Sequence, residues 1–193
     1  NVLKVAKNDE SDTFKTKATF VELAPNPGNI QAGGTVVATP HNYLVNINLL
    51  QQQGMFIKCN IDGTVQLSQL TSDDDKKNGT FNIIAGLDAN IKNAVSFQVY
   101  SYGQYYLKNQ NGALKVDKLK NTATFNTNAT FVTVQGLAGN GYSYEAANQP
   151  GHYIVADNGV LKISKDDGSA AFNKAATFME MPLEPKPQAP VKK

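Results

Sequence analysis

Two short patterns, each present four times and held at a nearly constant separation, constrain the fold of this chain more than any other feature. The first is an apolar dyad around one polar residue: Leu3-Lys4-Val5, Val65-Gln66-Leu67, Leu114-Lys115-Val116 and Leu161-Lys162-Ile163. The second ends in phenylalanine: Ala18-Thr19-Phe20, Gly79-Thr80-Phe81, Ala129-Thr130-Phe131 and Ala176-Thr177-Phe178. The dyad and the phenylalanine are 15, 14, 15 and 15 residues apart. This register indicates that the chain is built from repeated structural units.

The last three units also carry the sequence signal of a β-hairpin. An aromatic–aliphatic pair precedes each dyad: Phe56-Ile57, Tyr106-Leu107 and Tyr153-Ile154. Between pair and dyad stand Asp62-Gly63, Asn111-Gly112 and Asn158-Gly159. These dipeptides favour two-residue turns with positive φ angles. A further strand-like segment precedes each hairpin, at residues 43–50, 95–102 and 142–147. Each unit therefore predicts four short strands in about 45–50 residues.

A β-trefoil is a six-stranded barrel closed by three hairpins, and it requires three units of four strands. Closure of the barrel removes the exposed sheet edges, which is a physical reason for such repeats to stop at three. A four-stranded unit also suits a propeller blade, but propellers usually need four or more blades and a longer chain. We therefore predict an all-β fold with a β-trefoil over residues 43–183.

The segments outside residues 43–183 predict a domain boundary at each end. Residues 1–28 match the second half of a unit and are interpreted as a half trefoil repeat, followed by a linker over residues 29–42. Residues 184–193 form a Pro/Lys-rich tail. Unpaired strand edges and an apolar face predict that residues 1–23 pair with another polypeptide segment in a longer, tandem-trefoil protein. The alternative is that these strands pack on the outside of the single trefoil.

The composition excludes several kinds of partner. The formal charge is +2, the lysines are scattered, and the sequence has no arginine and no tryptophan, so nucleic-acid binding is not expected. No apolar run approaches the roughly 20 residues of a membrane-spanning helix. Cys59 is the only cysteine, which excludes an internal disulfide and predicts a buried, inert thiol.

The sequence also predicts a protein without catalytic activity, metal or cofactor. Glycoside hydrolysis needs two carboxylates across a cleft, and nothing marks such a pair among the sixteen acidic residues. His41 and His152 are the only histidines, and no strained nucleophile turn accompanies them. The run Asp73-Asp74-Asp75 lacks the alternation and the glycine of a calcium loop, so it is predicted to be a solvated loop.

The repeat motifs carry a resemblance to a known family. They are Tyr106-Leu107-Lys108-Asn109, Leu114-Lys115-Val116-Asp117, Asn128-Ala129-Thr130-Phe131, Asp167-Gly168-Ser169-Ala170-Ala171-Phe172 and Ala175-Ala176-Thr177-Phe178. They resemble the repeat of the arabinose-binding domain of α-L-arabinofuranosidase B, carbohydrate-binding module family 42. That repeat runs as Tyr-Leu-Arg-His, Leu-x-Leu-Asp, Asp-Gly-Ser-Ala-x-Phe and Asp-Ala-Thr-Phe. The resemblance covers about residues 43–183 and implies a β-trefoil.

The resemblance also implies where a sugar would bind. In that family the histidine of the first motif and the aspartate of the last face a shallow pocket and hydrogen-bond an arabinofuranosyl side chain. The histidine position holds Cys59, Asn109 and Ala156 in this sequence, and the aspartate position holds Lys17, Asn78, Asn128 and Ala175. A sugar hydroxyl that faces alanine or cysteine loses a hydrogen bond, at a cost of about 1–3 kcal/mol.

Only the unit from Val95 to Phe131 has two amide side chains at these positions, Asn109 and Asn128. Amides donate and accept hydrogen bonds and therefore suit a neutral sugar. Tyrosines at 100, 102, 105 and 106 cluster nearby in the sequence and offer ring faces, although alternate tyrosines also suit the interior of a barrel. The predicted sugar-binding residues are Tyr102, Tyr106, Asn109 and Asn128.

Two function classes follow. The first is a non-catalytic, lectin-like carbohydrate-binding module for arabinofuranosyl or related neutral sugars. The second is a structural or protein-interaction trefoil that has lost its sugar pockets and belongs to a larger surface or secreted assembly. The preserved scaffold favours the first and the missing histidine and aspartate favour the second. Both classes predict an extracellular or cell-surface protein, with a polysaccharide or glycan as the partner of the first.

Overall fold

The computed structural model describes residues 35–38 and 41–183, and this part of the chain is an all-β fold. Twelve antiparallel strands share one sheet. The strands are β1 (Tyr43–Leu49), β2 (Phe56–Cys59), β3 (Val65–Ser68), β4 (Thr80–Ala85), β5 (Ala94–Val99), β6 (Tyr105–Gln110), β7 (Ala113–Lys118), β8 (Phe131–Gln135), β9 (Tyr142–Ala146), β10 (His152–Asp157), β11 (Val160–Lys165) and β12 (Phe178–Pro182). The short helices are α2 (Asp73–Asn78), α3 (Ala123–Asn128), α4 (Ala170–Ala175) and the 3-10 helix η1 (Tyr100–Tyr102). The predicted all-β class is confirmed.

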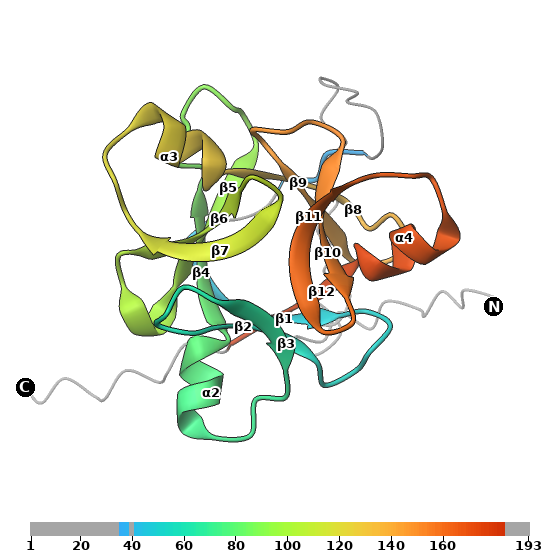
Figure 1. Ribbon diagram of the computed structural model, residues 1–193, viewed down its shortest axis with the longest axis horizontal. Helices are drawn as coiled ribbons and strands as arrows, with labels where there is room; N and C mark the ends of the chain where they lie inside the picture. Colours follow the sequence, from blue (N-terminus) through green and yellow to red (C-terminus); the bar gives the residue numbers. More distant parts are fainter. Residues whose placement is uncertain (1–34, 39–40, 184–193) are drawn as a thin grey trace, which may run out of the picture.

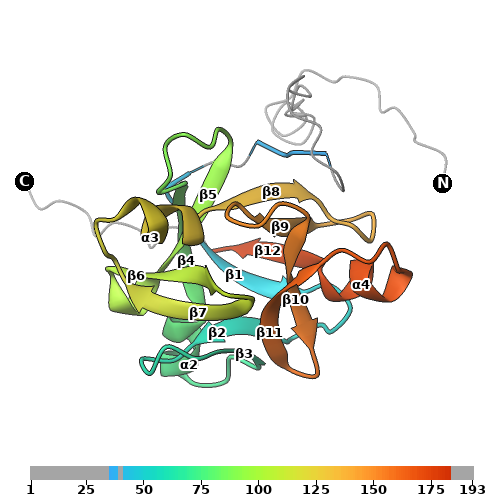
Figure 2. The same ribbon diagram turned by 45° about the horizontal axis from the view of Figure 1, so that its top comes forward.

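Six of the strands pair in a closed ring. Each neighbour in the order β1, β4, β5, β8, β9, β12 is hydrogen-bonded to the next, and β12 pairs with β1 to complete the ring. The remaining six strands form three hairpins, β2–β3, β6–β7 and β10–β11. Strands β1, β12, β9 and β8 lie side by side in Figure 2. A closed ring leaves fewer exposed edges than an open sheet of the same size.

The repeated phenylalanines occupy matching positions in this ring. Phe81, Phe131 and Phe178 are all fully buried. Each is paired in register with one residue of the first strand of its own unit and one of the next unit: Val45 and Val99, Val95 and Ala146, Tyr142 and Leu49. The same inter-strand register therefore recurs three times.

Aromatic rings fill the centre of the largest core cluster. The Phe97 ring lies 4.9 Å from that of Tyr144, 5.6 Å from that of Phe131 and 6.3 Å from that of Phe81, measured between centroids. Two of the three pairs are edge-on, an arrangement that adds to the stability gained by burial. This core explains why short strands from distant parts of the chain close into one sheet.

The three hairpins meet at their turns. Val116 N donates to Gly63 O at 3.1 Å, Ile163 N to Gly112 O at 2.8 Å, and Leu67 N to Gly159 O at 3.1 Å. Each hairpin thus donates one backbone hydrogen bond to a neighbour and accepts one from the other. Figure 1 shows the hairpins around the middle of the view, with α2, α3 and α4 at the periphery.

Two of the three predicted turns have the expected geometry. Asn111–Gly112 and Asn158–Gly159 have positive φ at both positions, as a two-residue hairpin turn requires. The prediction was wrong for Asp62–Gly63, where only the glycine has positive φ and strand pairing stops at Cys59 and Val65. There Asn60 N donates to Thr64 O and Asp62 Oδ1 accepts from Thr64 N, so the chain makes a wider turn.

The prediction of a solvated loop at Asp73–Asp75 was also wrong, because these residues begin α2. Ser72 caps the helix by accepting from Asp75 N, and the Asp75 carboxylate accepts from Ser72 N in return. Thr122 and Ser169 cap α3 and α4 by accepting from Phe125 N and Phe172 N. A hydroxyl residue before each helix satisfies backbone N–H groups that the helix itself leaves unpaired.

Part of the predicted linker adds a short stretch of pairing to the sheet. Val36 bridges to Val134, Val37 N donates to Thr133 O, and Gln135 N donates to Thr35 O. The predicted half repeat at 1–28, with its proposed pairing over 1–23, and the tail at 184–193 lie outside the described residues. Among the residues described, no helix has the length and apolarity needed to cross a membrane.

Candidate functional site

The common register of the hairpins identifies equivalent positions in the three units. Tyr106 pairs with Asp117 in one hairpin as Tyr153 pairs with Ser164 in another and Phe56 with Ser68 in the third. Cys59, Asn109 and Ala156 therefore occupy one equivalent strand position, as the sequence alignment of the units predicted. Asn78, Asn128 and Ala175 are each the last residue of α2, α3 or α4.

In the unit of Asn109, amide side chains fill the space between the strand position and the last residue of the helix. Asn109 is fully buried, and its Nδ2 donates to Asn148 Oδ1 at 2.9 Å and to Gln149 Oε1 at 2.7 Å. Its Oδ1 accepts from Gly112 N at 2.9 Å. Asn148 Nδ2 in turn donates to Asn128 Oδ1 at 2.9 Å. The two predicted asparagines thus belong to one network, and Asn148 bridges them.

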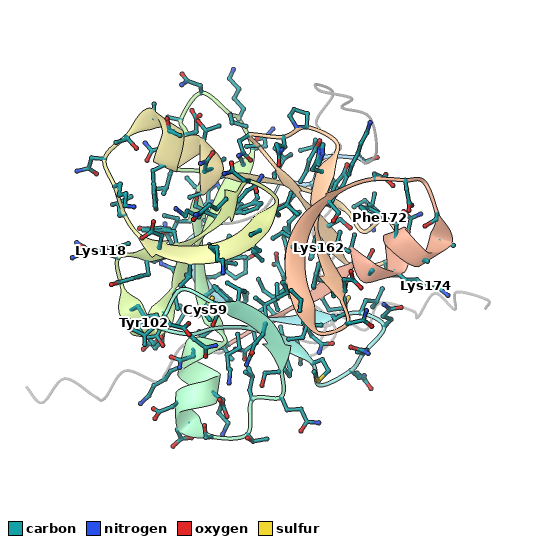
Figure 3. All side chains as sticks on the ribbon, in the orientation of Figure 1. Cys59, Tyr102, Lys118, Lys162, Phe172 and Lys174 are labelled. Carbon is teal, nitrogen blue, oxygen red and sulfur yellow. The ribbon has the colours of Figure 1, made fainter. Side chains whose placement is uncertain are left out.

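The two predicted tyrosines lie elsewhere. Tyr106 is buried against Phe125 and Ala129 below α3, and its hydroxyl accepts from Gln98 Nε2 at 3.1 Å. Tyr102 lies beside Cys59 of the preceding unit (Figure 3). Its ring lies 5.9 Å from that of Tyr105. The structure therefore does not bring Tyr102 together with Asn109 and Asn128.

An ion pair closes the other face of the same hairpin. Lys108 Nζ lies 2.8 Å from Asp117 Oδ2 and 5.6 Å from the centre of the Phe125 ring. Burial opposes the ionisation of Asp117, but hydrogen bonds from Lys108 and Lys120 outweigh it and lower the pKa of this carboxyl to about 2. The amide network and the ion pair thus lie on opposite faces of β6, since Lys108 and Asn109 are neighbours on that strand.

The unit of Cys59 is closed as well. The thiol is fully buried, as predicted, and burial raises its pKa. Ser101 Oγ donates to Asn78 Oδ1 at 2.9 Å, and Lys58 Nζ pairs with Asp75 Oδ1 at 2.8 Å. The Ser101–Asn78 contact matches Asn148–Asn128 in position. The ion pair differs, because Asp75 stands where Phe125 stands and Ser68 where Asp117 stands.

The last unit has smaller side chains at four of the positions that are filled in the Asn109 unit. Val155 stands where Lys108 stands, Ala156 for Asn109, Ser164 for Asp117 and Ala175 for Asn128. Since neighbouring side chains of a strand point to opposite faces, these substitutions remove bulk from both sides of β10. Two cavities flank this strand, and both are lined by Ala156 and Asp157.

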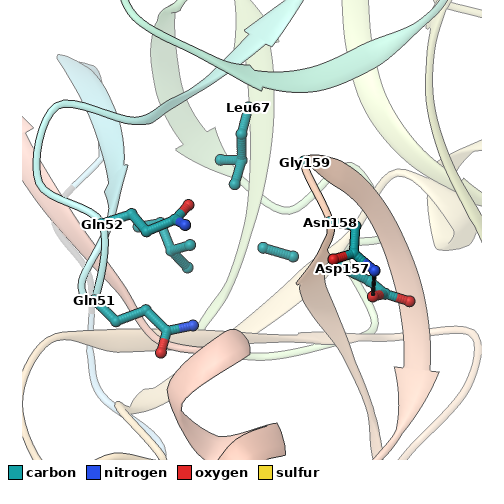
Figure 4. A pocket seen from close by; sticks show the side chains of 8 residues that line it. Gln51, Gln52, Leu67, Asp157, Asn158 and Gly159 are labelled. Carbon is teal, nitrogen blue, oxygen red and sulfur yellow. Dashed lines mark hydrogen bonds between the residues drawn. The ribbon is translucent and has the colours of Figure 1, made fainter.

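The first hollow has a volume of about 300 Å³ and is shown in Figure 4. Leu49, Leu67 and Ala156 supply apolar lining. Its polar lining comes from Gln51, Gln52, Asp157 and Asn158. This size is at the lower end of the range for small-molecule sites.

The second hollow, of about 350 Å³, lies between the β10–β11 hairpin and α4. Lys162 on β11 and Phe172 on α4, both labelled in Figure 3, belong to opposite walls. Val155, Ala156 and Ala175 add apolar surface, and Ser164, Lys165 and Asp167 add polar groups.

Two polar side chains at the first hollow are available to a ligand. Within the described chain, the side-chain amides of Gln51 and Gln52 form no hydrogen bond, and both residues are exposed. Asp157 is already engaged, because its carboxylate accepts from Lys162 Nζ at 2.6 Å and from Asn158 Nδ2 at 3.0 Å. The charges of this pair cancel, which favours a neutral ligand over an ionic one.

Sequence reasoning missed Gln51, Gln52, Asn148 and Gln149. They lie in the connections between the first two strands of a unit, which have the same length in all three units. Gln51 therefore corresponds to Ser101 and to Asn148. Ser101 and Asn148 contact the preceding unit, and Gln51 lines the first hollow of the last unit. Alignment of these equal-length connections was a usable signal. The described residues contain no cluster of side chains suited to a metal ion.

Comparison with known proteins agrees with this arrangement of strands. The chain matches the α-L-arabinofuranosidase B (ABFB) domain family over residues 51–154 and 135–183. It belongs to this family. The predicted resemblance is therefore confirmed, and all residues that line the two hollows except Leu49 lie within the part of the chain that matches the ABFB domain. A search of curated proteins found no match.

Solved structures similar to this ABFB domain include several glycosidases. An arabinofuranosidase in complex with arabinofuranosyl-α-1,2-xylobiose is 21% identical with a TM-score of 0.65, over 76% of this chain and 32% of its own. A GH54 α-L-arabinofuranosidase soaked with a cyclic sulfate inhibitor is 20% identical with a TM-score of 0.67, over 77% and 33%. A GlcNAcα1-4Gal-releasing endo-β-galactosidase from Clostridium perfringens is 16% identical with a TM-score of 0.59, over 74% and 33%. The chain spans about a third of each of these proteins, and at these identities the likeness concerns the fold.

Proposed function

We infer that the domain is a β-trefoil built from three repeats over residues 43–183. The closed ring of six strands, the three hairpins that bond one another at their turns, and the common register of Phe81, Phe131 and Phe178 support this inference. An experimental structure in which these three phenylalanines fail to superpose under a threefold rotation would exclude it.

We propose that the chain is a non-catalytic carbohydrate-binding module that recognises arabinofuranosyl or related neutral sugars. Membership of the ABFB domain family supports a role in binding carbohydrate. The observation that carries the proposal is the open first hollow at the position where the other two units are filled. The accessible lining of this hollow is mainly polar, and the free amides of Gln51 and Gln52 suit the hydroxyl groups of a sugar.

A second place for a sugar within the same function is the amide network of Asn109 and Asn128, with Tyr106 from the same unit and Tyr102 from the neighbouring pocket. A sugar at that place has to displace Asn148 and replace its hydrogen bonds to both asparagines. Loss of buried hydrogen bonds is costly unless the ligand restores them. We therefore assign the sugar to the first hollow before this network.

One observation favours the alternative function, a structural or protein-interaction trefoil. The two closed units satisfy their own pocket groups internally, so they offer little to a ligand. Under either function we propose that the protein is extracellular or at the cell surface. We also propose that the domain is attached to an enzyme or belongs to a larger assembly.

The test is a glycan array together with pull-down on insoluble arabinan and arabinoxylan. The wild-type protein should bind at least one of these glycans. Q51A/Q52A should lose binding by about tenfold or more. N128A, which alters the closed network at an equally polar place, should bind as the wild type does.

Three other results have distinct meanings. Loss of binding in N128A with retention in Q51A/Q52A would move the site to the Asn109 network. Retention of binding in both variants would exclude both places. Absence of binding by the wild type to every glycan on the array would favour the protein-interaction function.

A further inference from the structure

The second hollow is lined by Ala156 and Ala175, which stand at the histidine and aspartate positions of the family repeat. It shares Ala156 and Asp157 with the first hollow but differs from it in chemistry. Its lining includes the Phe172 ring and the side chains of Val155, Ala156 and Ala175. Phe172 is 9% and Val155 is 5% exposed, so these groups form a fixed apolar surface between β10 and α4. A small apolar group would be removed from water on this surface.

The origin of the hollow explains its shape. In the Asn109 unit the same space is occupied by Lys108, whose ammonium group reaches both Asp117 and the face of Phe125. In the last unit Val155 and Ser164 replace the ion pair, while Phe172 still stands where Phe125 stands. The vacated volume therefore lies beside an aromatic ring and under a hydroxyl.

Two polar groups at this hollow have no partner in the described chain. The Ser164 hydroxyl and the Lys165 ammonium group line the cavity and take part in no hydrogen bond or ion pair among the described residues. Both donate hydrogen bonds, so they suit a carbonyl oxygen. The four charged side chains of the lining are two lysines and two aspartates, Lys162, Lys165, Asp157 and Asp167. Their charges cancel, which argues against a carboxylate or phosphate ligand.

We propose that the second hollow binds an acetyl group carried by the polysaccharide that the module recognises. The methyl group would lie on Phe172, Val155 and Ala175, and the carbonyl oxygen would accept from Ser164 or Lys165. The cavity of about 350 Å³ has room for an acetyl group together with part of the sugar that carries it. This inference rests on the proposed carbohydrate-binding function and names the substituent that the module selects.

The experiment compares one arabinoxylan before and after partial acetylation with acetic anhydride, by isothermal titration calorimetry. The wild-type protein should bind the acetylated polymer about tenfold more tightly than the unmodified one. V155K/S164D rebuilds the ion pair of the Asn109 unit inside the hollow, so it should bind the two polymers equally. S68D makes the same serine-to-aspartate change at the equivalent position of the β2–β3 hairpin, and it should keep the wild-type preference.

The outcomes separate this inference from the proposed function. If the wild type binds both polymers equally, the acetyl subsite is wrong and carbohydrate binding stands. If V155K/S164D keeps the preference while its thermal unfolding matches the wild type, the subsite lies elsewhere and the proposal fails. Absence of binding to both polymers would contradict the proposed function on this polymer and the acetyl subsite with it.

Discussion

The β6–β7 hairpin with α3 and the β10–β11 hairpin with α4 share one backbone plan and differ in what fills the space beside it. In the first, which we call the closed unit, Asn109, Asn148 and Asn128 form a hydrogen-bonded chain, and Lys108 pairs with Asp117. In the second, the open unit, valine, serine and two alanines stand at the corresponding positions and two cavities remain. The same strand register is therefore compatible with a space filled by hydrogen-bonded polar side chains and with an open cavity.

This difference indicates a division of roles within the repeat. Buried polar side chains that are fully hydrogen-bonded stabilise a single arrangement, whereas small side chains leave room for a ligand at little cost to the backbone. We expect side chains of the closed unit to stabilise the fold and those of the open unit to bind the proposed ligand. Four predictions test this division.

The largest effect should come from what the two units share. F131A in the closed unit and F178A in the open unit each remove a fully buried ring and should each lower the free energy of unfolding by about 3–5 kcal/mol. The two losses should agree within about 1 kcal/mol, because both phenylalanines are fully buried at equivalent register positions in the ring. Urea denaturation followed by circular dichroism measures both. A large difference would mean that the units do not share one core.

The next effect belongs to the closed unit alone. N109A leaves Asn148, Gln149 and the Gly112 N–H without their partner, so it should cost about 2–3 kcal/mol of unfolding free energy. Q110A, which changes the exposed neighbour on β6, should cost less than about 0.5 kcal/mol. The same urea titration measures both variants. A loss in N109A no greater than that in Q110A would contradict the role of the amide chain.

A smaller effect should depend on acid pH. The pKa of Asp117 is lowered to about 2 in the folded protein, below its ordinary value of 3.8. Its contribution to stability is therefore present above about pH 4 and is lost as the pH falls through about 2. D117N should lower the unfolding free energy by about 1–2 kcal/mol at pH 6 and by nearly nothing at pH 2.

Ser164 in the open unit is the matched control for this measurement. S164N introduces the same amide where no ion pair exists, so its difference from the wild type should not change between pH 6 and pH 2. If D117N and S164N show the same pH dependence, the ion pair of the closed unit does not stabilise the fold.

The smallest effect concerns Glu180 in β12, at the register position that Thr133 occupies in β8. Burial raises the pKa of Glu180, although the Tyr43 and Tyr144 hydroxyls both donate to its carboxylate. A raised folded-state pKa means that stability falls as the pH rises through that pKa. E180Q should remove this slope and be more stable than the wild type by about 1 kcal/mol at pH 7.

The buried Glu145 also has a raised pKa, so E180Q should keep the part of the pH dependence that Glu145 causes. Thermal unfolding of both proteins between pH 4 and pH 8 isolates the share of Glu180. Parallel pH profiles for the two proteins would show that Glu180 is not responsible.

Much of the fold was predictable because its signals are local. Alternation of apolar and polar residues specifies a strand with one buried face, and Asn-Gly specifies a tight hairpin turn. Asn111–Gly112 and Asn158–Gly159 have the expected positive φ angles. The short helices were missed because six residues carry too little periodicity, although the hydroxyl residues that cap them, such as Ser72, were visible in the sequence.

The candidate site was only partly predictable. The sequence by itself determined the strand pattern, the buried phenylalanines and the equivalence of Cys59, Asn109 and Ala156, since each depends on spacing along one unit. Only the tertiary structure decided which of these positions is open. Closure of the ring places Gln51 and Gln52, which follow β1, next to Ala156 on β10. It also places Asn148 within hydrogen-bonding distance of Asn109. Contacts between units depend on the packing of the whole barrel, and no local pattern encodes them.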